Sequence, residues 1–483
     1  MRCTAGQAIT INDLPDDVLL AIFDFYVDEY KYPEPIHFRK REIESWQLLV
    51  HVCRRWRGLV FASPHRLNLR LCCTPETSAR MSLNVWPALP LLIQGGGPVD
   101  NIIAELEYSD RICQIEIYIS WFTSWEIEEL WTAMQVPFPE LTALRLVHDD
   151  SSSVPFLPDS FLCGSAPRLR SLALASIPFP GIPKLLLYAI HLVRLSLSNI
   201  PHSGYISPEA MVTYLSALTS LQLLHLGFES PESCPDLETQ PPFLSTRFVL
   251  PTLSEFWFKG ASEYLEQLVA RIDAPQARWL SITFFNAIHY DTPEFTQIIS
   301  RTPKLGVYDE ASIIFNDYDT IVRLRPHPGS SDDRMVKVKI LSLVGSDWQL
   351  SSLAPICTST FRPILTMENL YIYEYLYLSL DRRDDTEDSE WLDFLHPLSD
   401  VKNLYLSRQI APHIAPALQE LTGERTTELF PALQNIFVEG FKPSEPIHEG
   451  IARFISARQL INRPVVISVW ARGYKSEESE VDD

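Results

Sequence analysis

The stretch HVCRRWRGLVFASP, residues 51–64, gathers residue types that could do chemistry. His51 and Cys53 carry side chains that bind transition metals, and the arginines around Trp56 could contact phosphate groups or a protein. Three kinds of site are therefore open: a metal ligand pair, a nucleic-acid patch and a helix that holds a partner. The elements around the stretch decide among them.

The element that carries the stretch decides whether a metal can bind. Apolar spacing predicts a helix from about Ile43 to Phe61, and on such a helix His51 and Cys53 project about 200° apart. They therefore cannot bind one metal ion within it. The apolar face is made by Leu49, Val52, Cys53, Trp56, Leu59 and Val60, and the other face by His51, Arg54, Arg55 and Gly58. We expect Cys53 to be a small buried apolar residue and the arginines to form a solvated or partner-facing edge.

The charge of the chain excludes the nucleic-acid patch. The 483 residues include 40 basic and 61 acidic side chains, whereas general nucleic-acid binding needs a broad positive face. The cysteines are scattered without a C-x-x-C pair, which favours reduced thiols in a cytoplasmic or nuclear protein. Neither a signal peptide nor an apolar run of ~18 residues is present, so we expect no membrane partner.

No pattern predicts catalysis or a cofactor. The glycines at 95–97 are followed by Pro98 rather than by Gly-Lys-Ser/Thr, which predicts a flexible turn and not a phosphate-binding loop. The histidines show no H-E-x-x-H motif and no zinc spacing, and no G-x-S-x-G elbow is present. We expect a protein that is not an enzyme and that holds no cofactor and no metal.

Residues 11–27, INDLPDDVLLAIFDFYV, predict a helix ahead of the opening stretch. Pro15 suits a first helical position, and Asp16 and Asp17 favour the positive end of the helix dipole. An apolar stripe at helical spacing follows, made by Val18, Leu19, Ile22, Phe23 and Tyr26. Charged residues and two prolines over 28–44 predict a loop between this helix and the next.

From residue 138 onward a pattern, apolar-x-x-apolar-x-apolar, repeats at steps of 23 to 34 residues, with one step of 61 that leaves room for a degenerate copy over 311–315. Helical patterning lies between the copies, as in 208–218. A strand, a turn and a helix of this size cannot bury an apolar face alone, but stacked units form one continuous core. The copies start at Leu141, Leu169, Leu192, Leu221, Leu253, Ala277, Val338, Met367, Val401 and Leu433. After them, RPVVISVW predicts a closing strand, and a charged loop interrupts the array at 381–390.

Residues 12–69 resemble an F-box, in the motifs LPDDVLLAIF and VCRRWRGLV followed by SPHRLNLRL. The repeats resemble leucine-rich repeats, and the two parts together resemble an F-box protein of the divergent kind common in fungi. The resemblance implies an α/β fold with a helical F-box domain and a leucine-rich-repeat-like solenoid, or horseshoe. The expected parts are the F-box over 1–75, a connecting segment and first divergent repeat over 76–137, the solenoid over 138–470 and an acidic disordered tail over 471–483.

The resemblance also implies a function. In that family the F-box docks on a Skp-type adaptor of a cullin–RING ubiquitin ligase, and the second domain holds the substrate. The chain would then be the substrate-recognition subunit of a Skp–cullin–F-box ligase for an unknown protein target. By position, the adaptor contact or its supporting core falls on Leu14, Pro15, Val18, Leu19, Ile22, Phe23, Val52, Cys53 and Trp56. The segment 28–44 is longer than usual in the family, and the regular asparagine after the strand in well-formed repeats is missing.

Aromatic residues mark a second candidate surface, for the substrate. In each repeat strand, the residues beside the inward apolar ones face the concave side, and exposed aromatics there suit binding. They are Trp257, Trp279, Tyr371, Tyr373, Tyr405 and Phe437; the first four copies carry Arg145, Ala173, Ser196 and His225. Covering by long loops or by the tail, or a register shift of one residue, would instead bury them.

Two alternatives stay open. A leucine-rich-repeat scaffold that binds proteins without any role in ubiquitylation needs only the concave surface. The two predicted N-terminal helices could likewise be a cap over the first repeat, since a cap also needs one apolar face.

Overall fold

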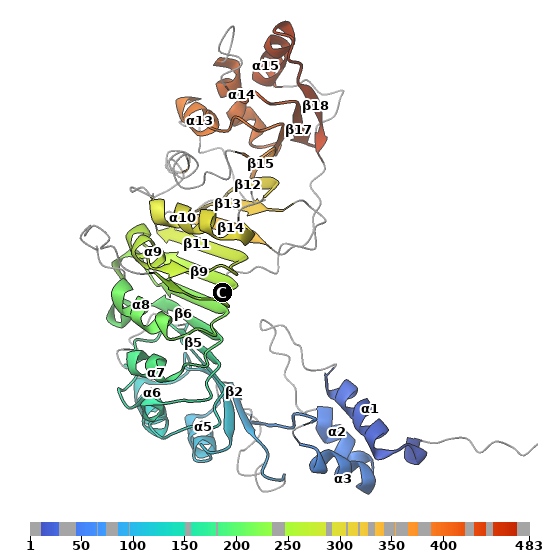
Figure 1. Cartoon of the computed structure of the whole chain (residues 1–483), viewed down its shortest axis with the longest axis vertical. Helices are drawn as coiled ribbons and strands as arrows, with labels where there is room; N and C mark the ends of the chain where they lie inside the picture. The colour runs from blue at the N-terminus through green and yellow to red at the C-terminus, as the bar shows by residue number, and fades with distance from the viewer. Residues whose placement is uncertain are drawn as a thin grey trace, which may run out of the picture. The chain divides into compact units, whose positions relative to one another are not determined.

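Figure 1 shows the computed structural model of the chain. The structure describes residues 11–28, 45–64, 66–73, 86–95, 97–149, 156–179, 182–233, 247–285, 292–305, 308–316, 319–326, 334–341, 353, 366–374, 388–420, 429–440 and 448–470. The predicted loop 28–44 and tail 471–483 therefore lie almost wholly outside the described residues. The chain divides into two compact units, Met1–Leu169 and Arg170–Asp483. Both combine helices with mostly parallel strands, so the predicted α/β class is confirmed.

The first unit opens with four helical elements. They are a short 3-10 turn, η1 (Ile11–Asp13), and the helices α1 (Asp16–Asp28), α2 (Ser45–Val52) and α3 (Arg54–Ala62). Leu19 and Phe23 of α1 are buried, and Phe23 packs on Trp56 of α3 with ring centroids 4.7 Å apart. Pro15 directly precedes α1, one residue before the first helical position that the sequence predicted for it.

The single helix predicted over 43–61 is wrong, because the chain breaks at Cys53. Cys53 has extended backbone angles, φ −159° and ψ 170°, and its Sγ accepts the backbone N–H of Trp56 at 3.4 Å. It is therefore the N-cap of α3 and not a buried apolar residue within one helix. The break also turns Val52 out of the predicted apolar face, since its side chain is exposed.

The rest of the first unit is a parallel sheet with crossover helices. The strands β1 (Leu71–Cys73), β2 (Leu91–Gly95), β3 (Ile112–Tyr118) and β4 (Ala143–Val147) pair in chain order. Helices α5 (Val99–Leu106) and α6 (Ser124–Ala133) connect the last three, and η2 (Phe161–Gly164) follows β4. The segment 76–137 thus already holds two strand–helix pairs.

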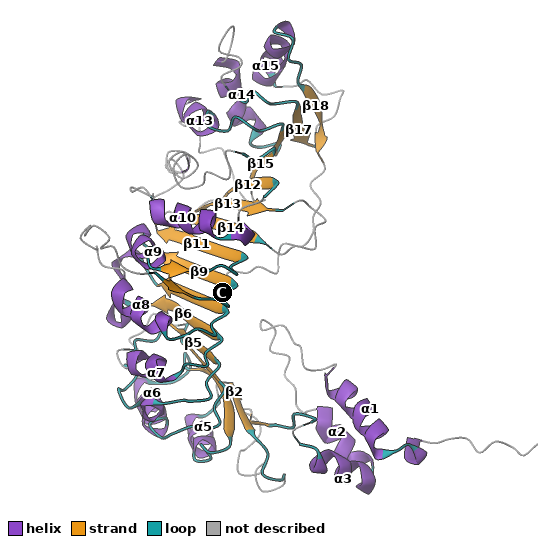
Figure 2. Cartoon of the chain, in the orientation of Figure 1, coloured by secondary structure: helices purple, strands orange, loops and turns teal. Residues whose placement is uncertain are grey.

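The second unit continues the strand–helix pattern. Parallel strands β5 (Ser171–Ala175), β6 (Arg194–Ile200), β7 (Leu223–Phe228), β9 (Glu255–Gly260) and β11 (Trp279–Phe285) lie side by side. The helices α7 (Ile182–Tyr188), α8 (Pro208–Ser216), α9 (Ser262–Val269) and α10 (Pro293–Arg301) follow one side of them (Figure 2). Short elements η3 (His202–Gly204), η4 (Pro231–Ser233), η5 (Pro303–Leu305), β8 (Phe248–Val249) and β10 (Ile272–Asp273) complete the connections. All ten predicted copies of the repeat pattern supply a strand.

An antiparallel meander interrupts the parallel array, which the sequence did not predict. The strands β12 (Glu310–Phe315), β13 (Asp319–Arg325) and β14 (Met335–Leu341) fold back on one another, and β14 rather than β12 pairs with β11. The degenerate copy predicted over 311–315 is therefore a strand, β12, but it pairs with the next repeat strand instead. Parallel order then resumes with β15 (Asn369–Glu374), β16 (Asn403–Leu406), β17 (Asn435–Glu439) and β18 (Val466–Trp470). The helices here are α13 (Asp388–Leu395), α14 (Ala411–Glu420) and α15 (Glu449–Leu460).

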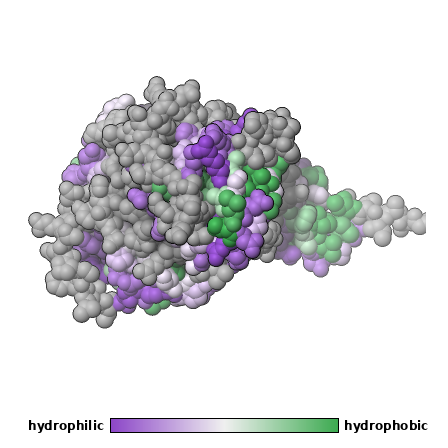
Figure 3. Space-filling model, turned by 90° about the horizontal axis from the view of Figure 1, so that it is seen from above, coloured by the Kyte–Doolittle hydropathy of each residue, from purple (hydrophilic) through white to green (hydrophobic). Residues whose placement is uncertain are grey.

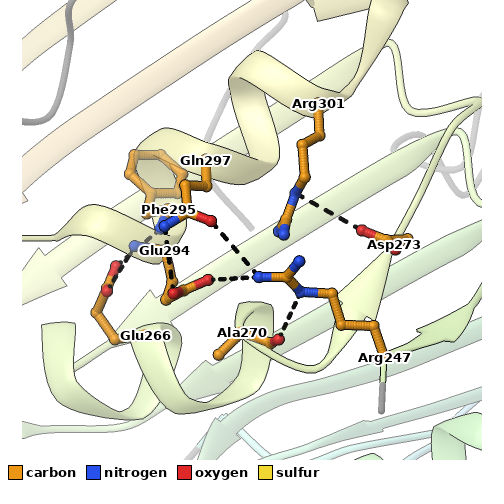
Figure 4. A network of polar contacts seen from close by, with 8 residues as sticks. All are labelled: Arg247, Glu266, Ala270, Asp273, Glu294, Phe295, Gln297 and Arg301. Carbon is orange, nitrogen blue, oxygen red and sulfur yellow. Dashed lines mark hydrogen bonds and ion pairs between the residues drawn. The ribbon is translucent and has the colours of Figure 1, made fainter. Parts of the chain in front are cut away.

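A polar network ties consecutive repeats together on the helix side (Figure 4). The carboxylate of Glu266 in α9 accepts the backbone N–H groups of Glu294 and Phe295 at 2.9 Å each, which caps the first turn of α10. Arg247, just before β8, donates to the carbonyl of Ala270 and to the Glu294 carboxylate. Because a helix start leaves unpaired N–H groups, this cap fixes where α10 begins and holds it against α9.

None of the described helices is long and apolar enough to cross a membrane.

Candidate functional site

The helices α1, α2 and α3 of the first unit, here called the helical unit, carry two stripes of exposed apolar side chains. On α1, Val18, Ile22 and Phe25 recur at helical spacing, and Phe25 is 74% exposed. On α2, Leu48 and Val52 form a second stripe, and Val52 is 58% exposed. In the space-filling view apolar side chains gather on the N-terminal helices, at the right (Figure 3). We call these five residues the apolar patch; single exposed apolar residues are ordinary, but two stripes on helices in contact indicate an interaction surface.

The structure separates the predicted adaptor residues into three groups, exposed, half-buried and buried. Val18, Ile22, Val52 and Pro15 are exposed, whereas Leu14 and Cys53 are half-buried. Leu19, Phe23 and Trp56 are buried, so they form the supporting core rather than a contact surface. The sequence analysis missed Phe25 and Leu48, although both stand four residues or fewer from a predicted member of their stripe and could have been found by helical spacing.

The arginines of the opening stretch are exposed, as predicted for a solvated or partner-facing edge, and two of them also link the helices. Arg55 donates to the carbonyl of Leu14 and to the carboxylate of Asp16, both at 2.6 Å. Arg57 donates through Nε to the carbonyl of Val50, across the break at Cys53, at 3.0 Å. Among the residues that the structure describes, no group of three or more His, Cys, Asp or Glu side chains could hold a metal ion.

A different side of the helical unit packs on the chain that follows. The indole N–H of Trp46 donates to the carbonyl of Arg70 at 3.0 Å, next to β1. Trp86, just before β2, packs edge-on against Trp46 and lies close to Phe61. The unit therefore already uses one apolar face to anchor itself, and the apolar patch is additional to it.

The second candidate surface is the side of the unit 2 sheet that faces away from the helix-side core, here called the open face. It is defined by one central residue per strand: Trp257, Ser281, Lys337, Arg323, Ser312, Tyr371, Tyr405 and Phe437, paired in register from β9 to β17. Their strand neighbours, such as Phe256 and Leu404, are buried on the helix side. The predicted strand register is thus correct at Trp257, Tyr371, Tyr405 and Phe437.

Three of the predicted aromatics form a stacked ladder. The rings of Tyr371 and Tyr405 lie 4.1 Å apart and those of Tyr405 and Phe437 4.5 Å apart, with interplanar angles of 8° in both pairs. All three side chains are half-buried. Burial, followed by the nearby Glu310 carboxylate and Tyr405, raises the pKa of Tyr371, so its hydroxyl stays protonated. Ring faces that pack on each other leave edges and hydroxyl groups, rather than faces, for a partner.

Trp470, the last residue of β18, extends the ladder and was missed by the sequence analysis. Its ring centroid lies 5.6 Å from that of Tyr371 and 5.8 Å from that of Tyr405. Tyr373 is only 7% exposed and packs with Ile314 and Ile321 in a small apolar cluster beside Trp470. The prediction that Tyr373 is an exposed contact residue is therefore wrong, because this cluster buries it.

An asparagine ladder runs beside the aromatic one. Asn403 donates to the side-chain carbonyl of Asn369 at 2.9 Å, and Asn435 donates to that of Asn403 at 2.8 Å. The sequence analysis found no asparagine after the strands, but these three occupy the first position of β15, β16 and β17. The signal was present in the sequence as Asn at the third position of three consecutive pattern copies.

Trp257 and Trp279 stack on the same sheet surface, with centroids 5.8 Å apart. Both are half-buried, and His225 lies next to Trp257, 6.3 Å between centroids. Burial, followed by the charge of Lys259, lowers the pKa of His225 to about 4, so the imidazole is neutral at physiological pH. This half of the open face can therefore offer indole surface and a neutral ring to a protein chain.

Basic residues of β13 and β14 lie between the two aromatic groups in the order of the sheet. Arg323 and Lys337 lie directly opposite each other on β13 and β14. Lys339 forms an ion pair with Asp319 at 3.2 Å, and Lys259 lies on β9. The open face thus has a basic centre in a chain whose formal net charge is −21.

No family model and no curated protein matches the chain. Among solved structures it is similar to a chain in the crystal structure of the Rad7 and Elc1 complex in yeast, with 12% identity over 90% of this chain and 91% of that chain. The TM-score of that match is 0.27, too low for the likeness to bear on the fold or the function of this chain.

Proposed function

We propose that this protein is the substrate-recognition subunit of a Skp–cullin–F-box ubiquitin ligase. The helical unit docks on a Skp-type adaptor through the apolar patch, and a leucine-rich-repeat-like solenoid holds a protein target on the open face. The protein is then a receptor and not an enzyme, and it works in the cytoplasm or the nucleus without a cofactor.

The apolar patch is the observation that carries this proposal. An N-terminal cap needs one apolar face, and the packing of Trp46, Phe61 and Trp86 already supplies it. Exposing five further apolar side chains to water is unfavourable, so their retention favours a partner that buries them. Three of the five patch residues, Val18, Ile22 and Val52, also stand at positions at which the F-box resemblance implies adaptor contact.

A protein scaffold with no role in ubiquitylation would need only the open face. Nothing in such a role accounts for a second apolar surface on the helical unit. Adaptor binding therefore separates the two functions.

The test is co-purification of the full chain with a Skp-type adaptor, comparing wild type with the double variant Ile22→Asp and Val52→Asp. Losing two buried contacts of this size costs roughly 3 kcal/mol or more, so adaptor affinity should fall at least about 100-fold. Both side chains are exposed, so the variant should fold, which circular dichroism and thermal unfolding check. Leu460→Asp, at a residue 88% exposed on α15, is the matched control and should bind as wild type does. Wild-type protein that is folded but does not bind the adaptor would refute the proposal.

A further inference from the structure

Two tryptophans on the surface of the first unit have no role in the sites described above. Trp121, in the turn after β3, is 82% exposed, and Trp125, in the first turn of α6, is 59% exposed. Single exposed apolar residues are ordinary, but tryptophan is highly buried on average, and two exposed indoles four residues apart are unusual. Tryptophan is also the residue type most enriched among side chains that dominate protein interfaces. These two residues therefore mark a candidate interaction surface.

The backbone that carries the two tryptophans is held in place by hydrogen bonds. Ile119 donates its N–H to the carbonyl of Val147 at 2.8 Å, and Phe122 donates its N–H back to the carbonyl of Ile119 at 3.0 Å. A capping box then starts α6: the Glu126 carboxylate accepts the backbone N–H of Thr123 at 2.8 Å and its hydroxyl at 2.6 Å. Because the backbone is already ordered, a partner that binds the indoles loses little affinity to the ordering of this loop.

Exposed carboxylates lie beside both indoles. Glu128 and Glu129 follow Trp125 by three and four residues, so they lie on the same side of α6. Asp149 follows β4, and its backbone N–H binds the hydroxyl of Ser120, the residue before the first tryptophan, at 2.7 Å. All three acidic residues are exposed. Each indole thus has at least one carboxylate in its neighbourhood.

Basic residues are missing from the same part of the sequence. The residues from Ile112 to Leu144 include five glutamates and no Lys, Arg or His. The next residue, Arg145, forms an ion pair with Glu116 at 3.6 Å. The surface therefore combines indole rings with an excess of negative charge, which complements a positively charged partner and repels the phosphate groups of nucleic acids and of anionic lipids.

Indole rings and carboxylates favour the same kind of ligand. The face of an indole attracts a guanidinium or ammonium group within about 6 Å of its centre, and a nearby carboxylate adds a charge-assisted hydrogen bond. Arginine suits both contacts best, because its planar guanidinium stacks on an aromatic ring and also binds a carboxylate through two N–H groups. An uncharged apolar segment would use the indoles alone and would desolvate the carboxylates without compensation.

We propose that Trp121 and Trp125, with the carboxylates of Glu128, Glu129 and Asp149, form a docking surface for an arginine-bearing basic segment of a protein partner. We call these five residues the tryptophan surface. The guanidinium groups of the segment stack on the indoles and pair with the carboxylates. The inference goes beyond the proposed function and does not depend on it, because the tryptophan surface shares no residue with the apolar patch or with the open face.

The test is fluorescence anisotropy of the full chain with a labelled synthetic peptide of Arg-Gly repeats. The wild type should bind this peptide, and it should bind a Lys-Gly peptide of equal length about three-fold or more weakly, because lysine lacks the planar fork. Trp121→Ser with Trp125→Ser should weaken binding of the Arg-Gly peptide about ten-fold or more. Both side chains are exposed, so this variant should fold, which circular dichroism and thermal unfolding check.

Matched carboxylate variants separate local recognition from the net charge of the chain. Glu128→Gln with Glu129→Gln, and Glu107→Gln with Asp110→Asn, each remove two negative charges from exposed residues of the first unit. The first pair should weaken peptide binding about five-fold or more, and the second by less than about two-fold. Equal weakening by both pairs, unchanged binding in the tryptophan variant, or no binding by the wild type would overturn the proposal.

Two other occupants of the tryptophan surface would give different results. A lipid surface is the occupant if the wild type, but not the tryptophan variant, binds phosphatidylcholine vesicles and does not bind the Arg-Gly peptide. A second copy of the chain is the occupant if the wild type sediments as a dimer and the tryptophan variant as a monomer. Either result overturns the proposal. None of these measurements uses the adaptor, so failure here is distinct from failure of the proposed function.

Discussion

Single residues show most clearly where local chemistry overrides a sequence pattern. Cys53 stands in an unbroken helical pattern, and spacing alone places it inside one helix. In the structure its sulfur accepts the hydrogen bond at the N-cap of α3, although cysteine is not among the residue types preferred at an N-cap. The pattern could not predict this, because it records which residues are apolar and not which ones accept a hydrogen bond.

The cap predicts the effect of substitutions at Cys53. Cys53→Ser should keep or raise the stability of the helical unit, because a hydroxyl is a better N-cap acceptor than a thiol. Cys53→Val should lower it by about 1 kcal/mol, because valine cannot accept the Trp56 N–H. Urea unfolding of both variants measures the difference. Equal stability of the valine variant and wild type would show that the sulfur contact contributes nothing.

Glu105 is a second residue whose setting the sequence does not reveal. It lies on α5, is 2% exposed, and burial raises the pKa of its carboxyl to about 8. Cys73 lies near it, and burial followed by the Glu105 charge raises the pKa of that thiol to about 12. At neutral pH both groups are therefore mainly uncharged in the folded protein.

The raised pKa of Glu105 predicts a pH dependence. The unfolded carboxyl ionises near its ordinary pKa of 4.5, while the folded one stays protonated until about pH 8. Stability therefore falls as pH rises through this window, by on the order of 3–5 kcal/mol in total. Glu105→Gln removes the titration and should gain on wild type by about 1 kcal/mol per pH unit from pH 5 to 8. Denaturation series at several pH values measure this, and the exposed neighbour variant Glu107→Gln should show no such trend.

At the scale of elements, the close contacts between helices depend on particular glycines that the sequence alone does not distinguish from others. In α15, a Cβ on Gly450 would lie 2.8 Å from the carbonyl carbon of Ala415 in α14, and closer still to its oxygen. In α3, a Cβ on Gly58 would meet no atom within 4 Å. Both glycines are helical, so only the neighbouring backbone distinguishes them.

The two glycines predict substitutions of opposite sign. Gly450→Ala should destabilise the α14–α15 pair by about 1–3 kcal/mol, because the backbones must separate. Gly58→Ala should stabilise α3 by about 0.5–1 kcal/mol, because alanine loses less conformational freedom on folding. Thermal unfolding of both variants gives the comparison. If both moved the transition in the same direction, the close approach at Ala415 would not be limiting.

The strands were predicted better than their order. Alternation of apolar residues predicted the correct face for the central residues of the repeat strands, as at Trp257 and Tyr405. The alternation fixes the face because a shift of one residue would place the apolar neighbours outside and these aromatics in the core. The meander of β12 to β14 was not predicted, since alternation is the same in parallel and antiparallel strands. The prediction that Tyr373 is exposed is wrong for a related reason. Ile314 and Ile321, which bury its side chain, lie on these antiparallel strands.

At the scale of the whole molecule, the two candidate surfaces are built independently. The apolar patch rests on the core of Leu19, Phe23 and Trp56 in the first unit, and the basic centre lies on strands of the second. They share no residue, and each is held by contacts within its own unit. In the proposed function, such surfaces let the chain bridge two partners without either partner altering the site of the other.

Independent surfaces predict the absence of coupling. Substituting Tyr371 and Tyr405 by Ser on the open face should change adaptor affinity by less than about two-fold, because the two surfaces share no residue and sites without shared contacts contribute additively. Likewise, removing residues 471–483 should leave adaptor affinity unchanged. Adaptor capture by wild type, by the double variant and by the chain ending at Trp470 measures both. A change of about ten-fold in either would correspond to a coupling free energy near 1.4 kcal/mol. In the proposed function, target binding would then control assembly with the adaptor.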